Sequence, residues 1–265
     1  MDIPRWSQQQ GTMEHKLLAC GLLATLMALV FVSRSLQAED EPPANEFRFT
    51  LSPYHPVKGN LSGFSRLGYY YNPDEGYSEY YLGWPGLVYE VKPWLQLWAG
   101  MHNTYKNNKN GADLLEPRPF AGVKLFVPNR AKINLYNFTR YEYRMTVNLD
   151  SGDWTYVNRI RSRFGIEVPF APRERAWMKR TFYGIANVEP FYRFDEDVVD
   201  PLDLRGGVGY VLNDRIRLEF IYYARFACED GMEPLEYSEN IFRLNMKIGI
   251  SRAILQSVLE GGGDD

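Results

Sequence analysis

Arginine recurs at every second position in two parts of the chain. One series is Arg159, Arg161 and Arg163, and the other includes Arg215, Arg217 and Arg225. Successive side chains of a β-strand point to opposite faces, so each series predicts a row of guanidinium groups along one face. Rows of this kind favour anions where they line a pore. Where they lie among carboxylates, they form buried ion pairs instead.

Charged residues of the alternating segments share one face, and apolar residues occupy the other. We expect the charged face to line a lumen in which bases outnumber acids. A packed ion-pair network that fills a narrow lumen is the interpretation we favour. An anion pore or pocket remains the alternative, because an unpaired buried charge is costly unless water or an anion enters. The expected lumen-lining residues are Arg140, Glu142, Arg144, Arg159, Arg161, Arg163, Glu167, Glu189, Arg193, Arg205, Arg215, Arg217, Glu219, Arg225, Arg243 and Lys247, with Arg66, Lys124 and Glu90 on the same face.

Candidate catalytic residues are few. Three histidines and two cysteines exclude a Cys/His zinc site, and we expect neither a metal nor a cofactor. His102 lies near one end of its predicted strand, and Thr104 shares its face two residues later. Membrane acyl hydrolases tend to carry a His-x-Ser pair, in which a base activates the nucleophile, and here Thr replaces Ser. We therefore expect no enzyme, and an outer-membrane lipid hydrolase that uses His102 is the enzymatic alternative.

Segments with a period of two residues carry these side chains from about residue 60 onward. In residues 215–226, Ile216, Leu218 and Phe220 alternate with charged residues, which predicts a strand with one apolar and one charged face. The predicted strands cover residues 63–72, 77–91, 94–106, 117–127, 131–148, 154–168, 181–195, 203–212, 215–228 and 240–252.

Strand length and polarity favour a membrane barrel over a soluble β-sandwich or a lipocalin-like barrel. Several predicted strands are more than twice as long as the average of about five or six residues in soluble proteins. A soluble barrel would turn its apolar face inward, and the arginine-bearing face would then point to water. We therefore predict an all-β fold, a transmembrane antiparallel β-barrel of about ten strands with lipid outside and a polar lumen inside.

The predicted connections alternate between tight turns and longer polar loops, as in outer-membrane barrels with an even number of strands. Residues 169–180 are the exception, a long connection on the side of the tight turns. Acidic residues gather in the longer loops, which include 107–116, 195–203 and 229–239, and basic residues gather at the turns. We expect the acidic loops to face the exterior and the basic turns to face the periplasm. Aromatic residues near the strand ends are expected to form belts at the membrane interfaces. They include Trp84, Trp94, Trp154, Tyr141 and Tyr156.

The N-terminus has the pattern of an export signal. Lys16 precedes the apolar run 17–32, and Ala38 offers a small residue at the cleavage point. We predict a signal peptide over residues 1–38, with Met13 as an alternative start and a single N-terminal anchor helix as the alternative structure. The remaining predicted parts are a lead-in arm (39–59), the barrel (60–252) and a flexible tail (253–265). A net charge of −3 argues against nucleic-acid binding.

Three segments of the C-terminal half resemble a bacterial family. They are RYEYRMTVNLDSGDWTYVNRIRSRFGIEVPF, YGIANVEPFYRF and DLRGGVGYVLNDRIRLEFIYYARF. Together they resemble the domain-of-unknown-function 2490 family over roughly residues 80–252. The resemblance implies an outer-membrane β-barrel, and it implies no catalytic residue.

These observations lead to an expectation for location and role. We expect a protein of the bacterial outer membrane that contacts lipid and lipopolysaccharide and is inserted by the barrel-assembly machinery. Other envelope proteins are expected as further partners. The expected role is structural or in envelope assembly, with a mostly filled, arginine-rich lumen. The alternative is a porin-like narrow channel or transporter for small anionic or lipid-like solutes.

Overall fold

The computed structural model describes residues 42–129, 131–228 and 235–249. The predicted signal peptide (1–38) and the predicted tail (253–265) lie outside these residues. Within them, no helix is long and apolar enough to cross a membrane. The helical element in this part of the chain is a single 3₁₀ turn, η1 (Arg173–Arg175).

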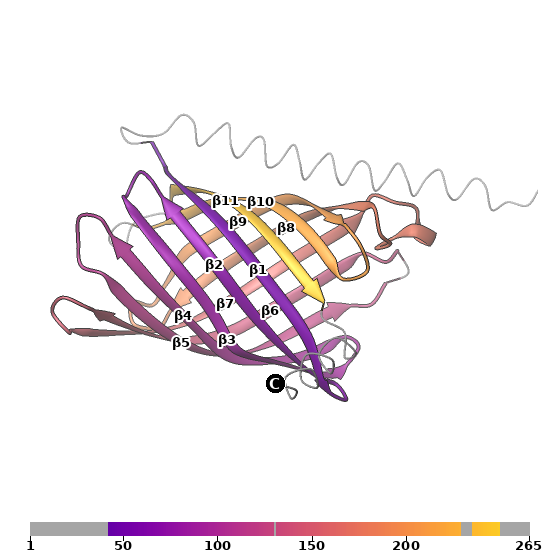
Figure 1. Cartoon of the computed structure of the whole chain (residues 1–265), viewed down its shortest axis with the longest axis horizontal. Helices are drawn as coiled ribbons and strands as arrows, with labels where there is room; N and C mark the ends of the chain where they lie inside the picture. Colours follow the sequence, from indigo (N-terminus) through magenta and orange to yellow (C-terminus); the bar gives the residue numbers. More distant parts are fainter. Residues whose placement is uncertain (1–41, 130, 229–234, 250–265) are drawn as a thin grey trace, which may run out of the picture. The chain divides into compact units, whose positions relative to one another are not determined.

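The described residues form eleven strands that close into one barrel, which confirms the predicted all-β barrel (Figure 1). Strands that are consecutive in sequence pair with each other, and β1 and β11 close the barrel. The barrel of the described residues has one strand more than the roughly ten that the sequence predicted. The strands are β1 (Ala44–Lys58), β2 (Leu61–Asn72), β3 (Tyr77–Lys92), β4 (Leu95–Asn108), β5 (Leu114–Val127), β6 (Asn134–Asn148), β7 (Trp154–Pro169), β8 (Thr181–Arg193), β9 (Val198–Val211), β10 (Ile216–Ala227) and β11 (Glu236–Gly249).

The additional strand is β1, which lies in the segment 39–59. The expectation of a lead-in arm there is wrong, because this segment alternates like the other strands and forms part of the barrel wall. Glu46 is buried in the interior, whereas Phe49 is exposed on the outside. β1 runs antiparallel to β2 and parallel to β11 over residues 44–54. An odd number of strands makes the first and last strands run in the same direction, so the closing pair has to be parallel.

Apolar and aromatic side chains cover the outside of the barrel. Along β10, for example, Phe220 is exposed on the outside while its neighbours Glu219 and Ile221 are buried. This alternation is the strand period that the sequence predicted. The aromatic residues expected at membrane interfaces are all on the exposed side, with fractional exposures from 44% to 59%. They are Trp84, Trp94, Trp154, Tyr141 and Tyr156.

The interior contains apolar side chains as well as charges. One cluster on β8–β11 includes Tyr183, Ile221 and Tyr223, and a second cluster packs Phe64 against Phe120. Ile221 and Tyr223 lie on the same face of β10 as its charged residues. The face of β10 that we expected to be charged is therefore partly apolar, and these side chains fill space between the ion pairs.

Large rings inside the barrel lie over glycines of neighbouring strands. A Cβ atom built on Gly209 would lie 2.1 Å from Cζ of Tyr183, its partner across the β8–β9 ladder. We expect Gly209→Ala to destabilise the barrel by about 1–3 kcal/mol, because the ring has no room to withdraw into a packed interior. Urea-induced unfolding in lipid vesicles measures this loss.

Gly206 on the same strand provides the matched control. A Cβ atom there would meet no atom within 4 Å. Gly206→Ala should therefore change the unfolding free energy by no more than about 0.5 kcal/mol. If both substitutions lower the unfolding free energy equally, the ring of Tyr183 is not the cause of the loss in Gly209→Ala.

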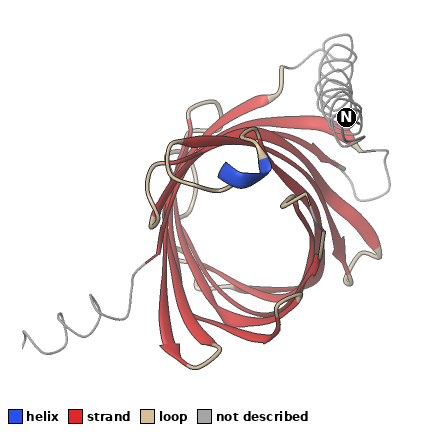
Figure 2. Ribbon diagram, turned by 90° about the vertical axis from the view of Figure 1, so that its right-hand side faces the viewer, coloured by secondary structure: helices blue, strands red, loops and turns tan. Residues whose placement is uncertain are grey.

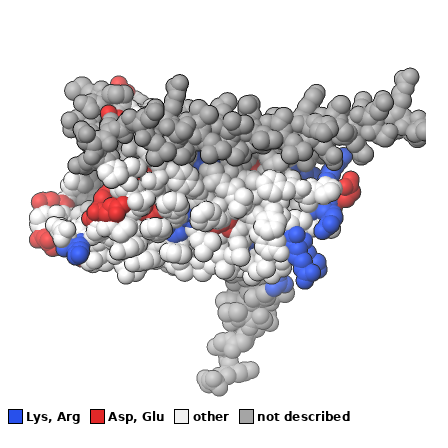
Figure 3. All heavy atoms as spheres, turned by 90° about the horizontal axis from the view of Figure 1, so that it is seen from above, with Lys and Arg blue, Asp and Glu red and all other residues white. Residues whose placement is uncertain are grey.

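The two ends of the barrel carry opposite charge (Figure 3). The β2–β3, β4–β5, β6–β7 and β8–β9 connections lie at one end, which we call the acidic rim. The opposite end, the basic rim, carries the β1–β2, β3–β4, β5–β6, β7–β8 and β9–β10 connections. The acidic rim includes Asp74, Glu75, Asp113, Asp150, Asp153, Asp195, Glu196 and Asp197, together with Lys109. The basic rim includes Lys58, Lys92, Lys132, Arg173, Arg175, Lys179, Arg180 and Arg215, together with Glu174 and Asp214.

Loop length does not distinguish the rims as we expected. The β4–β5 connection spans only 109–113, and the β8–β9 connection spans 194–197 instead of 195–203. The longest connection joins β7 to β8 over 170–180 and belongs to the basic rim, where the sequence predicted one long connection among the tight turns. The expectation of long acidic loops is wrong because the strands continue into these polar segments. Three acids that we expected in these loops, Glu116, Asp203 and Glu239, therefore meet arginines inside the barrel.

The β7–β8 connection reaches across part of the basic mouth of the barrel (Figure 2). Trp177 in this connection donates a hydrogen bond of 2.7 Å from Nε1 to the carbonyl oxygen of Lys132 in the β5–β6 connection. Its ring packs against Tyr183, with ring centroids 5.0 Å apart. The guanidinium of Arg217 on β10 lies 5.4 Å from the same indole ring. Trp177 therefore joins groups from several parts of the wall at this end.

Candidate functional site

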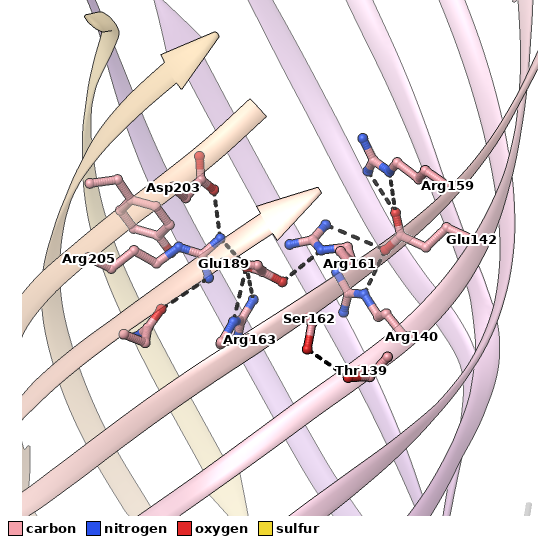
Figure 4. A network of polar contacts seen from close by, with 12 residues as sticks. Thr139, Arg140, Glu142, Arg159, Arg161, Ser162, Arg163, Glu189, Asp203 and Arg205 are labelled. Carbon is pink, nitrogen blue, oxygen red and sulfur yellow. Dashed lines mark hydrogen bonds and ion pairs between the residues drawn. The ribbon is translucent and has the colours of Figure 1, made fainter. Parts of the chain in front are cut away.

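Glu142 is the centre of the interior ion-pair network (Figure 4). It is fully buried on β6, and both carboxylate oxygens contact guanidinium groups. Oε1 lies 2.6 Å from Arg140 Nε and 3.4 Å from Arg161 Nη1, and Oε2 accepts a hydrogen bond of 2.8 Å from Arg159 Nε. Arg118 Nη1 lies 3.9 Å from Oε2. One carboxylate therefore interacts with four arginines from three strands.

Glu189 on β8 is a second centre, and only 1% of it is exposed. Arg161 Nε donates a hydrogen bond of 2.7 Å to Oε1, and Arg163 Nη2 donates one of 2.8 Å to Oε2. Glu189 also pairs with Arg205. Because Arg161 contacts Glu142 as well, it joins the two centres (Figure 4).

Asp203 extends the network to the last strands. It accepts hydrogen bonds of 2.7 Å from Arg205 and 2.8 Å from Arg225, and Arg225 also pairs with Glu239 on β11. At the other end, Arg118 pairs with Glu116 on β5. These contacts form a continuous ion-pair belt from β5 to β11. Its members, in order, are Glu116, Arg118, Glu142, Arg161, Glu189, Arg205, Asp203, Arg225 and Glu239.

A separate polar cluster surrounds Glu219 on β10. Oε1 accepts hydrogen bonds of 2.7 Å from the Tyr183 hydroxyl and 2.5 Å from Lys247 Nζ. Oε2 accepts one of 2.7 Å from Asn245. Lys247 also lies 3.9 Å from Glu167 on β7. Since hydrogen-bonded charges tolerate burial far better than isolated ones, this cluster can remain inside the barrel.

Most of the predicted lumen-lining residues lie in the belt, contact it directly, or surround Glu219. Arg144 pairs with Glu116 at 2.5 Å. Arg193 instead pairs with Asp195 and Glu196 at the acidic rim. Those in or beside the belt are Arg140, Glu142, Arg144, Arg159, Arg161, Arg163, Glu189, Arg205 and Arg225, and Glu167, Glu219 and Lys247 form the other cluster.

Arg215 does not line the interior. It is exposed in the turn before β10, where its backbone N–H donates a hydrogen bond of 2.9 Å to Asn213 Oδ1. β10 therefore begins at Ile216, one residue later than the alternating pattern predicted. Asparagine favours such a turn, because its side chain readily accepts hydrogen bonds from nearby backbone N–H groups. The expected alignment of Arg215 with Arg217 along the lumen is therefore wrong.

Several interior acids were not among the expected lumen-lining residues. Glu116, Asp203 and Glu239 were placed in the acidic loops, yet each lies on a strand and pairs with arginine. Glu46 on β1 pairs with Arg48 and accepts a hydrogen bond from the Tyr77 hydroxyl. The period-two signal around Glu46 could have found it, since it alternates with the large outward-facing rings of Phe47 and Phe49.

Some interior cations lack a carboxylate partner among the described residues. Arg243 donates to the hydroxyl groups of Thr50 and Tyr223. Lys124 Nζ lies 4.4 Å from the ring centroid of Tyr136 and interacts with its π-face. Arg66 has no ion pair in this part of the chain, and its Nε is buried without a hydrogen-bond partner. The interior therefore retains positive charge that the network does not neutralise.

His102 lies inside the barrel on β4, and only 2% of it is exposed. Its ring centroid is 4.4 Å from that of Phe120 and 5.1 Å from that of Tyr81. Thr104 is buried on the same face, but no hydrogen bond joins its hydroxyl to His102 in the described structure. Within the described residues, no group of three His, Cys, Asp or Glu side chains could hold a metal ion.

The chain matches a family model. Residues 48–231 match the model of a family described as a protein of unknown function (DUF2490). No curated protein and no solved structure matches the chain. The family model covers ten of the eleven strands in whole or in part, and it includes most members of the ion-pair belt.

Proposed function

This chain belongs to the DUF2490 family, and we propose that it is an outer-membrane β-barrel with a filled lumen and a structural or envelope-assembly role. The apolar outer wall supports the membrane location, because lipid-exposed faces of such barrels are apolar and edged by aromatic residues. Lipid and lipopolysaccharide would then surround the wall, and the barrel-assembly machinery would insert it. Other envelope proteins would bind at the charged rims.

The ion-pair belt is the observation that carries this proposal. It crosses the interior surface of seven strands, and its central carboxylates are almost completely inaccessible to solvent. The apolar clusters occupy further interior space, and the β7–β8 connection reaches across part of the basic mouth. A lumen that is held together in this way resists deformation, which suits an anchor for other proteins better than a pore.

Planar-bilayer recording of the purified full-length protein tests the filled lumen. We expect no stepwise conductance at physiological salt, with an open porin in the same bilayers as the positive control. The gel migration of the folded protein should be heat-modifiable, which verifies that the sample forms a barrel. A steady conductance from protein that passes this check would contradict the filled lumen.

A narrow pathway for small anions is the second candidate. Arg66, Lys124 and Arg243 favour it, because they present interior positive charge without a carboxylate partner in the described residues. An anion-selective conductance that is lost in Arg243→Gln would support this alternative. The lipid-hydrolase alternative is weaker, since His102 faces the interior and bilayer lipids contact the outer wall. We therefore propose that the protein is not an enzyme.

A further inference from the structure

A pocket of about 360 Å³ lies at the basic rim, where the β7–β8 connection meets β8. Its apolar part is formed by the exposed rings of Phe170 and Phe182, and the N–H of Phe170 donates a hydrogen bond of 3.0 Å to the carbonyl oxygen of Phe182. Phe182 alternates with Thr181 and Tyr183, whose side chains are buried inside the barrel. The ring of Phe170 lies over Gly184, which shares the outward face of Phe182. The pocket therefore opens on the outer wall and not into the lumen.

Two arginines line the same pocket. Arg175 is the last residue of η1, and Arg180 immediately precedes β8. Both are exposed, and within the described residues neither forms an ion pair with a carboxylate. The connection over 170–180 also contains Arg173 and Lys179 but only one acid, Glu174. Basic residues gather at this end of the barrel (Figure 3), so the pocket lies in a region of unneutralised positive charge.

Backbone contacts fix where these arginines lie. The N–H of Arg180 donates a hydrogen bond of 2.6 Å to the carbonyl oxygen of Val211, and the N–H of Arg175 donates one of 2.9 Å to that of Pro172. Arg180 has a φ of 64°, a conformation that residues other than glycine keep only where the surrounding contacts hold it. Trp177, between the two arginines, is tied by its indole N–H to the β5–β6 connection. The backbone that carries both guanidinium groups is therefore in place before a ligand binds, which lowers the entropic cost of binding.

The two parts of the pocket select a ligand that is anionic at one end and apolar at the other. A guanidinium group can donate two parallel hydrogen bonds to the oxygens of a phosphate. Phe170 and Phe182 continue the apolar outer wall, which acyl chains cover in outer-membrane barrels. A soluble anion would leave these rings uncovered, and an uncharged lipid would leave the arginines unpaired. An anionic phospholipid matches both parts.

We propose that this pocket binds one anionic phospholipid, whose phosphate lies between Arg175 and Arg180 and whose acyl chain lies along Phe170 and Phe182. The proposal rests on the proposed membrane location, in which the basic rim lies at the level of lipid headgroups. In the expected orientation these are the headgroups of the periplasmic leaflet. The pocket is outside the lumen, so the site does not depend on whether the barrel conducts ions.

Native mass spectrometry of the full-length protein in a neutral detergent tests this proposal. Phosphatidylglycerol is the anionic probe, and phosphatidylcholine with the same acyl chains is the zwitterionic control. The first phosphatidylglycerol should bind about fivefold or more tightly than the first phosphatidylcholine, as expected for two exposed ion pairs. Equal affinity for the two lipids would overturn the site.

Variants of matched charge localise the binding. Arg175→Gln with Arg180→Gln should abolish the preference for phosphatidylglycerol and leave phosphatidylcholine binding unchanged. Lys58→Gln with Lys92→Gln removes the same charge from other exposed positions of the basic rim and should keep the preference. An equal loss in both double variants would show a general attraction to the rim and would overturn the site. If the arginine double variant does not fold, Arg175→Gln alone decides, and unchanged phosphatidylglycerol binding in that variant would overturn the site.

Two competitors test the kind of ligand. Glycerophosphoglycerol has the same headgroup without acyl chains, and it should not displace phosphatidylglycerol at equal concentration. Displacement at equal concentration would assign a soluble phosphate ester and overturn the phospholipid. Lipid A that binds the pocket more tightly than phosphatidylglycerol would overturn it as well.

Insertion into phosphatidylcholine vesicles separates this proposal from the proposed function. Protein that is heat-modifiable and stays in the vesicles after a urea wash, but shows no preference for phosphatidylglycerol, overturns the lipid site and leaves the membrane barrel standing. Protein that is heat-modifiable but does not insert overturns both.

Discussion

Glu142→Gln should destabilise the barrel by about 3–5 kcal/mol, which is the usual cost of removing one partner from a buried ion pair. Glutamine fills the same volume, but it leaves four arginines without their shared negative charge. Equilibrium unfolding by urea in lipid vesicles, followed by tryptophan fluorescence, measures the loss. A loss below about 1 kcal/mol would mean that water reaches these arginines and screens them.

A matched control and a double mutant separate charge from packing. Glu75→Gln at the acidic rim changes an exposed carboxylate, so it should change stability by no more than about 0.5 kcal/mol. Adding Arg159→Gln to Glu142→Gln should restore part of the lost stability, because it removes one of the uncompensated charges. If the two losses simply add, the pair does not interact in the folded state.

A chain that begins at residue 60 should not form a folded barrel at all. It lacks β1, and with β1 it loses the backbone pairing that joins β2 to β11. It also loses Glu46 and Arg48, which leaves the Tyr77 hydroxyl without its acceptor. In the proposed membrane location, two long strand edges would then face lipid, where unpaired backbone groups cost several kcal/mol each. Heat-modifiable migration after refolding measures the result.

A chain that begins at residue 42 is the control for this truncation. It removes the residues that precede β1 and keeps all eleven strands of the described residues, so it should refold like the full-length protein. If the chain from residue 60 also refolds, β1 contributes nothing essential, and residues 39–59 act as the arm that their position before the first clear strand suggested.

The alternation of charged and apolar residues was sufficient to predict the barrel and the arginine-rich interior. The strand period alone places Arg159, Arg161 and Arg163 on one face. Which carboxylates they meet depends on the register of the neighbouring strands, which pairs Glu142 with Arg159 across β6 and β7 and brings Glu189 on β8 to Arg161 and Arg163.

The missed residues depend on contacts between segments far apart in the chain. Asp203 follows several acidic residues and looks like part of a solvated loop until Arg225, 22 residues later, is placed beside it. Glu239 has the same partner. β1 alternates like the other strands, so its local period could have predicted a strand; only its pairing with β11, at the other end of the barrel sequence, depends on a distant contact. Pairing across such distances leaves little trace in composition or local spacing.

The parallel contact between β1 and β11 also determines where the flanking segments of the chain emerge. The chain enters β1 at the acidic rim and leaves β11 at the basic rim, whereas a barrel with an even number of strands has both ends on one side. In a membrane, the residues before Ala44 and those after Gly249 therefore begin in different compartments. A partner that binds the first flank and a partner that binds the second would be linked through the bilayer by a single covalent chain.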